Sequence, residues 1–168
     1  HVTRLEEKLG IHGSPTAAIH FNHAEGFLVG EQGEGFKAML SLMNNARLGV
    51  AAQGIGIAEA SLRTALQYAR DRVQFGVPIA DQPLMKDRLA RMTLELEGSR
   101  ALLYRACSLV DQNHAISKAL KRTNDGGTEF SAGERVEMEA LFERNATRIR
   151  LLTPLAKYMG TEAADSIS

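Results

Sequence analysis

The sequence predicts a mainly α-helical protein, an up-down bundle of three long helices preceded by a short β segment. Three observations lead to this prediction. Apolar residues recur every three or four positions through three long stretches, which is the period of one helix face. The first 35 residues lack this period and are rich in glycine and histidine. Polar and turn-forming residues separate the helical stretches from one another.

The glycine-rich start is expected to supply the β part. The stretch 16–21 has β-branched and aromatic residues between turn-forming ones, so it is predicted to be a strand. A second apolar stretch, 27–29, is a further strand candidate. One or two strands do not make a stable domain, so their partners are expected upstream of His1. The sequence also stops within a helical pattern, and we expect it to be a piece of a longer protein.

The stretch 36–70 is predicted to form the first long helix, about 50 Å in length at 1.5 Å per residue. Its middle is unusually rich in small residues. Glycine within a helix costs roughly 1 kcal/mol relative to alanine, so several of them need a compensating reason. Close approach of another helix or of a ligand would supply one. The small residues are Gly49, Ala51, Ala52, Gly54, Gly56, Ala58 and Ala60.

Two further helices are predicted. The second covers 82–112, and the polar stretch 113–133 after it is predicted to be a mobile loop. The third begins at about Glu134, and Pro154 is expected to kink or break it. A fourth helix would complete the usual bundle.

Composition excludes several classes of protein. The 168 residues are 44% hydrophobic and 24% charged, within the globular range, and no apolar run is long enough to span a membrane. Twenty basic residues balance 20 acidic ones, which argues against a protein built to bind nucleic acid. The single cysteine, Cys107, cannot form an intrachain disulfide, so a reducing, cytoplasmic location is expected. Cys107 lies on an apolar helix face and is expected to be a buried small hydrophobe.

Two possible ligand motifs are weak. His20 and His23 lie three apart on a strand or its turn, which places them on opposite faces, so a metal site is not expected. The glycines at 30, 33 and 35 precede a helix but lack the Lys-Ser/Thr pair of a phosphate-binding loop. A plain turn into the helix is the better interpretation.

Two other features leave functional and structural roles open. Arg47 interrupts the apolar face of the first helix, where a charge is costly unless it is paired or extends to solvent. It could equally contact an anionic or carbonyl-bearing ligand. The turn 72–76 combines Arg72, Gln74, Phe75 and a glycine, which suits a phosphate and a flat ring. An ordinary interhelix turn is the competing interpretation.

Four motifs in order give the chain a recognisable resemblance. They are KLGIHGSPT at 8–16, LVGEQGEGF at 28–36, ARLGVAA at 46–52 and ALQYARDRVQFGVPI at 65–79. Together they resemble the acyl-CoA dehydrogenase family over about residues 5–112. Four motifs with matching spacing are far more specific than any one of them.

The resemblance implies a fold with an N-terminal helical domain, a middle β domain and a C-terminal four-helix bundle. Residues 1–32 would be the end of the middle domain, and 33–168 most of the bundle without its fourth helix. It further implies an acyl-CoA substrate, a homotetramer or homodimer, and an acceptor protein for electrons.

The resemblance also implies an FAD cofactor, which in the family touches a neighbouring subunit. The arginine and phenylalanine of the family's RxxFG turn, which contact the flavin nucleotide, are Arg72 and Phe75 here. Gln74 would add a hydrogen bond, and Gln82 occupies the place of a downstream glutamine that contacts FAD. The resemblance therefore favours a binding role for this turn.

For the substrate, the resemblance points to three positions. Ser14 matches a serine that touches the nucleotide portion of CoA, and Arg47 matches an arginine by the CoA entrance. Asn44 replaces an aspartate often found three residues before that arginine, so a charge-pair role there is in question.

The implied reaction is α,β-dehydrogenation of an acyl thioester, in which a glutamate removes the α-proton and the β-hydrogen leaves as hydride to the flavin. No residue of this sequence is assigned as that base. The family's usual glutamate position would lie beyond Ser168, and a less common position is occupied by Ala46. The polypeptide alone is therefore expected to be inactive.

Two alternatives remain from the residues alone. One is an acyl-CoA oxidase of the same superfamily, which nothing in these residues distinguishes. The other is a non-catalytic relative that uses the bundle to bind a partner or DNA; the balanced charge counts against DNA.

Overall fold

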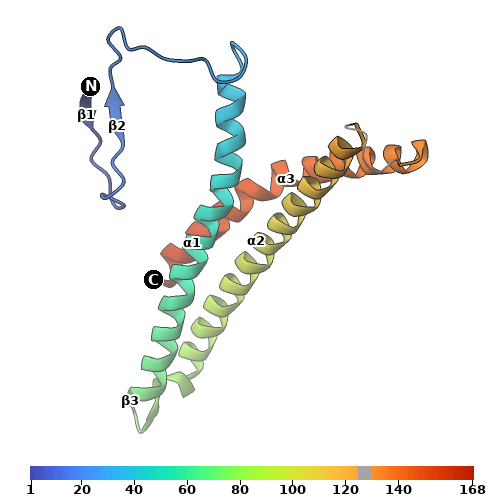
Figure 1. The fold of residues 1–168 in the computed structure, drawn as a ribbon. Coiled ribbons are helices and arrows are strands. Elements are labelled where there is room, and N and C mark those ends of the chain that lie inside the picture. The colour runs from blue at the N-terminus through green and yellow to red at the C-terminus, as the bar shows by residue number, and fades with distance from the viewer. Residues whose placement is uncertain (125–129) are drawn as a thin grey trace. The chain divides into compact units, whose positions relative to one another are not determined.

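The computed structural model of the protein describes residues 1–124 and 130–168. The chain divides into two compact units, His1–Lys37 and Ala38–Ser168. The first contains a two-stranded sheet, and the second contains nearly all of the helical structure (Figure 1). Each unit is described below by itself.

The first unit is an antiparallel strand pair. β1 (Val2–Leu5) pairs with β2 (Ala17–Ile19), with Val2 opposite Ile19 and an irregularity in register before Arg4. The strand predicted over 16–21 is thus confirmed in its central residues. The prediction of a strand at 27–29 is wrong, because these residues have no strand partner and are exposed. β1, which supplies the partner for β2, was not expected.

Three long helices make up the second unit. α1 (Gly35–Asp71) is followed by the short strands β3 (Val73–Gln74) and β4 (Val77–Pro78) and a 3₁₀ turn, η1 (Ile79–Asp81). α2 (Pro83–Asn124) then runs back alongside α1, and α3 (Ala132–Ile167) crosses both (Figure 1). The mainly α fold with a short β segment is confirmed. No helix among the described residues combines the length and apolar character needed to cross a membrane.

The mobile loop expected over 113–133 is mostly incorrect. α2 continues through Asn124, and only 125–129 lie outside the described residues. The helix continues because its inner face still contacts α3. Asn113 is buried, and its Nδ2 donates to the Phe142 carbonyl of α3 at 3.0 Å. Ile116 and Leu120, one and two turns further on, are half-buried.

A capping box starts α3. The Ser131 Oγ accepts from the Glu134 backbone N–H at 3.3 Å, and the Glu134 carboxylate accepts from the Ser131 N–H at 2.8 Å. These two bonds satisfy two donors that a helix start leaves free. The Ser131 hydroxyl also donates to the Glu134 carboxylate at 2.7 Å, and this bond, followed by the one from the Ser131 N–H, lowers the pKa of Glu134 below its ordinary value. α3 continues without a break through Pro154, so the break considered there does not occur.

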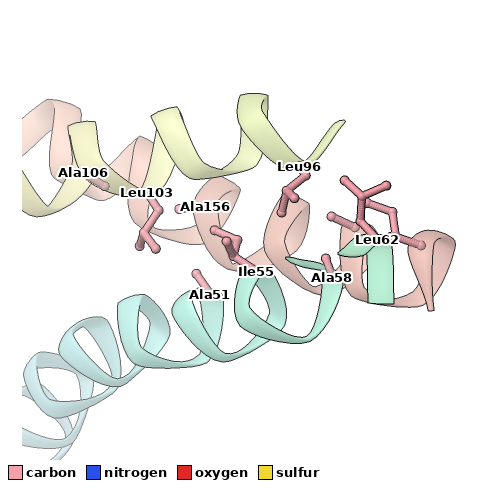
Figure 2. Packing of buried hydrophobic residues seen from close by; sticks show 10 residues of the cluster. Ala51, Ile55, Ala58, Leu62, Leu96, Leu103, Ala106 and Ala156 are labelled. Carbon is pink, nitrogen blue, oxygen red and sulfur yellow. The ribbon is translucent and has the colours of Figure 1, made fainter. Parts of the chain in front are cut away.

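The hydrophobic core lies where the three helices meet. Figure 2 shows its side chains converging from α1, α2 and α3. α1 and α3 together contribute four alanines, two isoleucines and one leucine, whereas α2 contributes two leucines and one alanine. The buried cluster consists of Ala51, Ile55, Ala58, Leu62, Leu96, Leu103, Ala106, Ala156, Ala163 and Ile167.

α1 and α3 cross with their backbones in contact. A Cβ added to Gly54 would lie 2.3 Å from the Gly160 carbonyl oxygen, and one added to Gly160 would lie 2.8 Å from the Ala51 carbonyl oxygen. Neither glycine can be replaced without moving a helix backbone. The close helix approach expected from the small residues of α1 is therefore found, at Gly54. Gly49 and Gly56 have no such contact.

An ion network joins α1 to α2. Glu59 of α1 accepts hydrogen bonds from Arg63 on its own helix and from Arg100 of α2, which also bonds Glu97. The bonds from Arg63 and then Arg100 hold the pKa of Glu59 below its ordinary value of 4.5. The side chains of Glu59 and Arg100 are about a quarter exposed.

The crossing predicts opposite effects for two alanine substitutions in one helix. Gly54→Ala should destabilise the protein by about 2 kcal/mol, because its methyl group meets the α3 backbone. Gly56→Ala, in open space, should stabilise it by about 0.5–1 kcal/mol through helix propensity. Urea unfolding followed by circular dichroism measures both. Equal effects of the two substitutions would contradict the close crossing.

The ion network predicts a pH-dependent effect of Glu59→Gln. Because the folded-state pKa of Glu59 is lowered, its contribution to stability is present above pH 4.5 and is lost as the pH falls through the lowered pKa. The variant should therefore be less stable than the original protein at pH 7, and the difference should shrink below pH 4.5. Glu162→Gln, at an exposed acid with no ion pair among the described residues, is the control. A difference that does not change with pH would exclude this role.

Candidate functional site

A tight hairpin connects α1 to α2. The Arg72 N–H donates to the Tyr68 carbonyl at the end of α1, and the Arg72 carbonyl accepts from the Ile79 N–H at 2.8 Å. Between them, Val73 pairs with Pro78 and Gln74 with Val77. The turn 72–76 is therefore more than a loose interhelix connection: hydrogen bonds fix both of its sides.

The tip of the hairpin holds a strained phenylalanine. Phe75 and Gly76 have φ values of 54° and 80°, the two positive values that a type I′ turn requires. Glycine takes this conformation readily, whereas a bulky residue rarely does. Phe75 gains no burial in return, since it is 94% exposed. Backbone strain without a packing benefit is typical of residues that contact a ligand.

Charged and polar residues precede Phe75 in the same hairpin. Arg72 and Gln74 are exposed, and within the described chain Arg72 has no ion pair. A guanidinium presents its donors in a planar fork that matches phosphate oxygens, and an amide both donates and accepts. Three of the four residues predicted for the cofactor thus lie on one exposed hairpin.

Gln82, the fourth, follows the hairpin directly. It is half-buried at the start of α2, where its carbonyl accepts from the Lys86 N–H at 3.0 Å. Its side chain lines a groove of about 520 Å³ along the first turns of α2, together with Met85, Arg88 and Met92. The groove combines apolar residues with two arginines and two acidic residues, Asp87 and Glu95.

Arg47 and Asn44 on α1 form a second group of candidate site residues, separate from the hairpin. The half-buried Arg47 donates from Nη1 to the Asn44 Oδ1 at 2.9 Å, one turn back along α1. No carboxylate pairs with Arg47 in the described part of the chain, so a structural ion pair does not account for it. Since Asn44 is neutral, the charge of Arg47 remains available to an anionic ligand.

The two groups lie far apart. Arg47 and Arg72 are separated by 25 positions on one helix, which corresponds to about 37 Å. They cannot contact the same small group. Ser14 is exposed in the loop between β1 and β2 of the first unit, where its backbone N–H donates to the Ile11 carbonyl at 3.2 Å.

Other candidate chemistry is absent or explained by packing. Among residues 1–124 and 130–168, no cluster of three potential metal-binding side chains occurs. Cys107 is half-buried against the core, and burial, followed by the charge of Asp111, raises the pKa of its thiol. A raised pKa disfavours the reactive thiolate. The sequence-based expectation of a packing role for Cys107 therefore holds.

Known proteins with this sequence pattern form one family. Residues 33–124, more than half of the chain, match the family model described as acyl-CoA dehydrogenase, C-terminal domain. The chain is 43% identical over 107 residues to a short-chain specific acyl-CoA dehydrogenase of Megasphaera elsdenii, covering 61% of this chain and 28% of that protein. It is 43% identical over 107 residues to 3-methylmercaptopropionyl-CoA dehydrogenase of Ruegeria pomeroyi, covering 58% and 18%.

A third relative extends the match. Glutaryl-CoA dehydrogenase of Desulfococcus multivorans is 34% identical over 136 residues, which cover 77% of this chain and 33% of that protein. The chain thus spans between 18% and 33% of the length of these relatives.

Solved structures agree with the sequence relatives. Butyryl-CoA dehydrogenase of Megasphaera elsdenii matches with a TM-score of 0.58 and 26% identity, over 96% of this chain and 42% of that one. A glutaryl-coenzyme A dehydrogenase in complex with glutaryl-CoA matches with a TM-score of 0.58 and 28% identity, over 97% and 42%.

The strain at Phe75 predicts the effect of two substitutions there. Phe75→Asn should stabilise the protein by about 1 kcal/mol, because Asn-Gly is the preferred pair for this turn and tolerates positive φ. Phe75→Leu keeps the strain and the exposure, and should leave stability nearly unchanged. Urea unfolding of both variants tests this. A loss of stability in Phe75→Asn would show that the ring contributes to packing.

Proposed function

This chain belongs to the acyl-CoA dehydrogenase family, and we propose that it is the part of an FAD-dependent enzyme that oxidises an acyl-CoA thioester to the 2,3-enoyl-CoA. The observation that supports the proposal most directly is the exposed hairpin with Arg72 and the strained Phe75. We assign residues 1–32 to the end of a middle β domain and 33–168 to the C-terminal helical bundle.

The hairpin fits the nucleotide half of FAD. The Arg72 fork matches the two charged phosphates of a pyrophosphate, and the exposed Phe75 ring offers a stacking surface for a flat base. Gln74 and the side chain of Gln82 add hydrogen-bonding groups on either side of the hairpin. When bound, FAD would supply the two-electron acceptor that the oxidation of a carbon–carbon bond requires.

The distance between the two groups on α1 supports separate ligands. We propose that Arg47, oriented by its bond to Asn44, attracts the phosphates of the CoA moiety in the N-terminal half of the helix. Arg72 and Phe75, about 37 Å away, then serve a flavin nucleotide at the other end. A helix that projects its hairpin this far is suited to reach a flavin bound by a second subunit, so we propose a homo-oligomer.

We propose that Ser14 contacts the nucleotide end of an acyl-CoA, as its match to the family's serine implies. No residue of this sequence is assigned as the base that removes the α-proton, and the segment that supplies it is proposed to lie outside the sequence. The protein's role here is therefore to bind and orient both ligands. A solved structure described as an electron transferring flavoprotein of Acidaminococcus fermentans matches this chain at 25% identity with a TM-score of 0.58, covering 99% of this chain and 43% of that one. The resemblance of the chain to that structure supports our proposal of a protein acceptor for the electrons.

The proposal is tested on the intact protein that contains this chain. It is mixed anaerobically with a panel of acyl-CoA thioesters while the flavin absorbance is followed. The panel includes butyryl-CoA, glutaryl-CoA and 3-methylmercaptopropionyl-CoA, the acyl groups that name the relatives. Bleaching by one thioester would establish the reductive half-reaction. A protein that neither contains nor takes up FAD would exclude a flavoenzyme.

Arg72→Ala should weaken FAD binding in the intact protein by about tenfold or more, because an arginine–phosphate contact is lost. Arg70→Ala is the matched control, since it removes an exposed arginine two positions away at the end of α1. Titration of apoprotein with FAD, followed by flavin fluorescence, measures both affinities. Equal losses in the two variants would indicate that only general positive charge is involved.

A further inference from the structure

Lys8 occupies an unusual place in the first unit. Of residues 1–37, all of which the structure describes, only Lys8 and Ala17 are half-buried, and the others are exposed. The loop between β1 and β2 therefore has no hydrophobic core. Leu9 and Ile11 within it point to solvent, with exposed fractions of 106% and 74%. Its conformation depends on hydrogen bonds.

The Lys8 ammonium group supplies two of those bonds. It donates to the Ile11 carbonyl at 2.9 Å and also to the Ser14 carbonyl. The Ser14 N–H donates to the same Ile11 carbonyl at 3.2 Å, and the Glu6 N–H closes the loop with a bond to the Thr16 carbonyl at 2.8 Å. Lys8 thus ties together the two ends of the turn that presents Ser14.

The turn that Lys8 closes is strained. Ile11 has φ = 55°, in the left-handed region that a β-branched residue strongly disfavours. Gly10 and Gly13, on either side, do not have positive φ. Such a conformation persists only where surrounding contacts determine it. The contacts at Ile11 and Ser14 are the two bonds from Lys8 and the bond from the Ser14 N–H to the Ile11 carbonyl, and every residue of this loop except Lys8 is exposed.

We propose that Lys8 is a positioning residue, which holds the Ile11–Ser14 turn in the conformation that presents Ser14 to the nucleotide end of the acyl-CoA. This inference rests on the proposed function, in which Ser14 makes that contact. A preformed turn lowers the entropy lost when substrate binds. Without Lys8 the turn would have to be ordered by the substrate itself, and the Michaelis complex would be weaker.

The first measurement is hydrogen exchange over residues 9–16 of the intact protein without substrate. Lys8→Met should speed exchange of the Ser14 amide about fivefold, since charge-assisted hydrogen bonds are lost. Lys8→Arg retains the donors and should restore slow exchange. Lys37→Met is the matched control, because it removes a lysine of the same unit whose partner is the exposed Glu34 at 2.9 Å. That control should leave exchange over 9–16 unchanged.

The second measurement separates positioning from general stability. KM is determined for an acyl-CoA and for the corresponding acyl-pantetheine, which carries the same thioester but lacks the nucleotide. Lys8→Met should raise KM about fivefold for the acyl-CoA only, with kcat unchanged. Lys8→Arg and Lys37→Met should resemble the original protein with both thioesters.

The outcomes are distinct. A KM increase for both thioesters, a KM increase without faster exchange, or faster exchange without a KM increase would each overturn the positioning role. The second of these would mean that Lys8 contacts the substrate directly. Ser14→Ala tests the underlying contact: if it leaves the acyl-CoA KM unchanged, the role proposed for Ser14 is wrong and this inference is wrong with it. An effect of Ser14→Ala with none of Lys8→Met overturns this inference alone.

Discussion

The backbone contact between α1 and α3 is the constraint on which the helical unit depends. Gly54 and Gly160 leave no space for a side chain, so the two helices meet at one register only. Around that point the alanines of α1 and α3 allow Leu96 and Leu103 of α2 to fill the remaining volume. The position of α1 then follows from packing, and Arg100 of α2 adds a charged link to Glu59. A helix held in this way gives fixed positions to the groups at both of its ends.

The candidate site uses those fixed positions. In the N-terminal half of α1, Arg47 bonds to a neutral asparagine and keeps its charge available. At the other end, the hairpin holds Phe75 in a conformation that costs stability and exposes a large ring to solvent. Neither feature benefits the fold. A planar cation, an amide and an exposed ring suit a nucleotide, and this chemical match connects the geometry to the flavin proposed for it.

Much of this could be predicted from the sequence, because helix period and small-residue content are local signals. The first helix and the starts of the second and third were expected close to their observed positions, and the glycines of α1 were expected to allow close approach of a helix or a ligand. The continuation of α2 beyond residue 112 was not predicted because its residues are mostly polar. Its inner face is evident only from the structure, in which Asn113 donates a hydrogen bond to the Phe142 carbonyl of α3. The link between Glu59 and Arg100, 41 positions apart, likewise depends on tertiary packing. The positive φ of Phe75 runs against residue preference, so only the structure reveals it.

We propose that the strain at the hairpin tip serves ligand binding and not the fold. The most direct test is to measure the FAD dissociation constant of the intact protein carrying Phe75→Asn beside its free energy of unfolding without FAD. We expect a more stable protein that binds FAD about tenfold more weakly, because the stacking surface is lost as the strain is relieved. Unchanged FAD affinity in the stabilised variant would mean that Phe75 has no part in holding the flavin and that its strain does not serve binding.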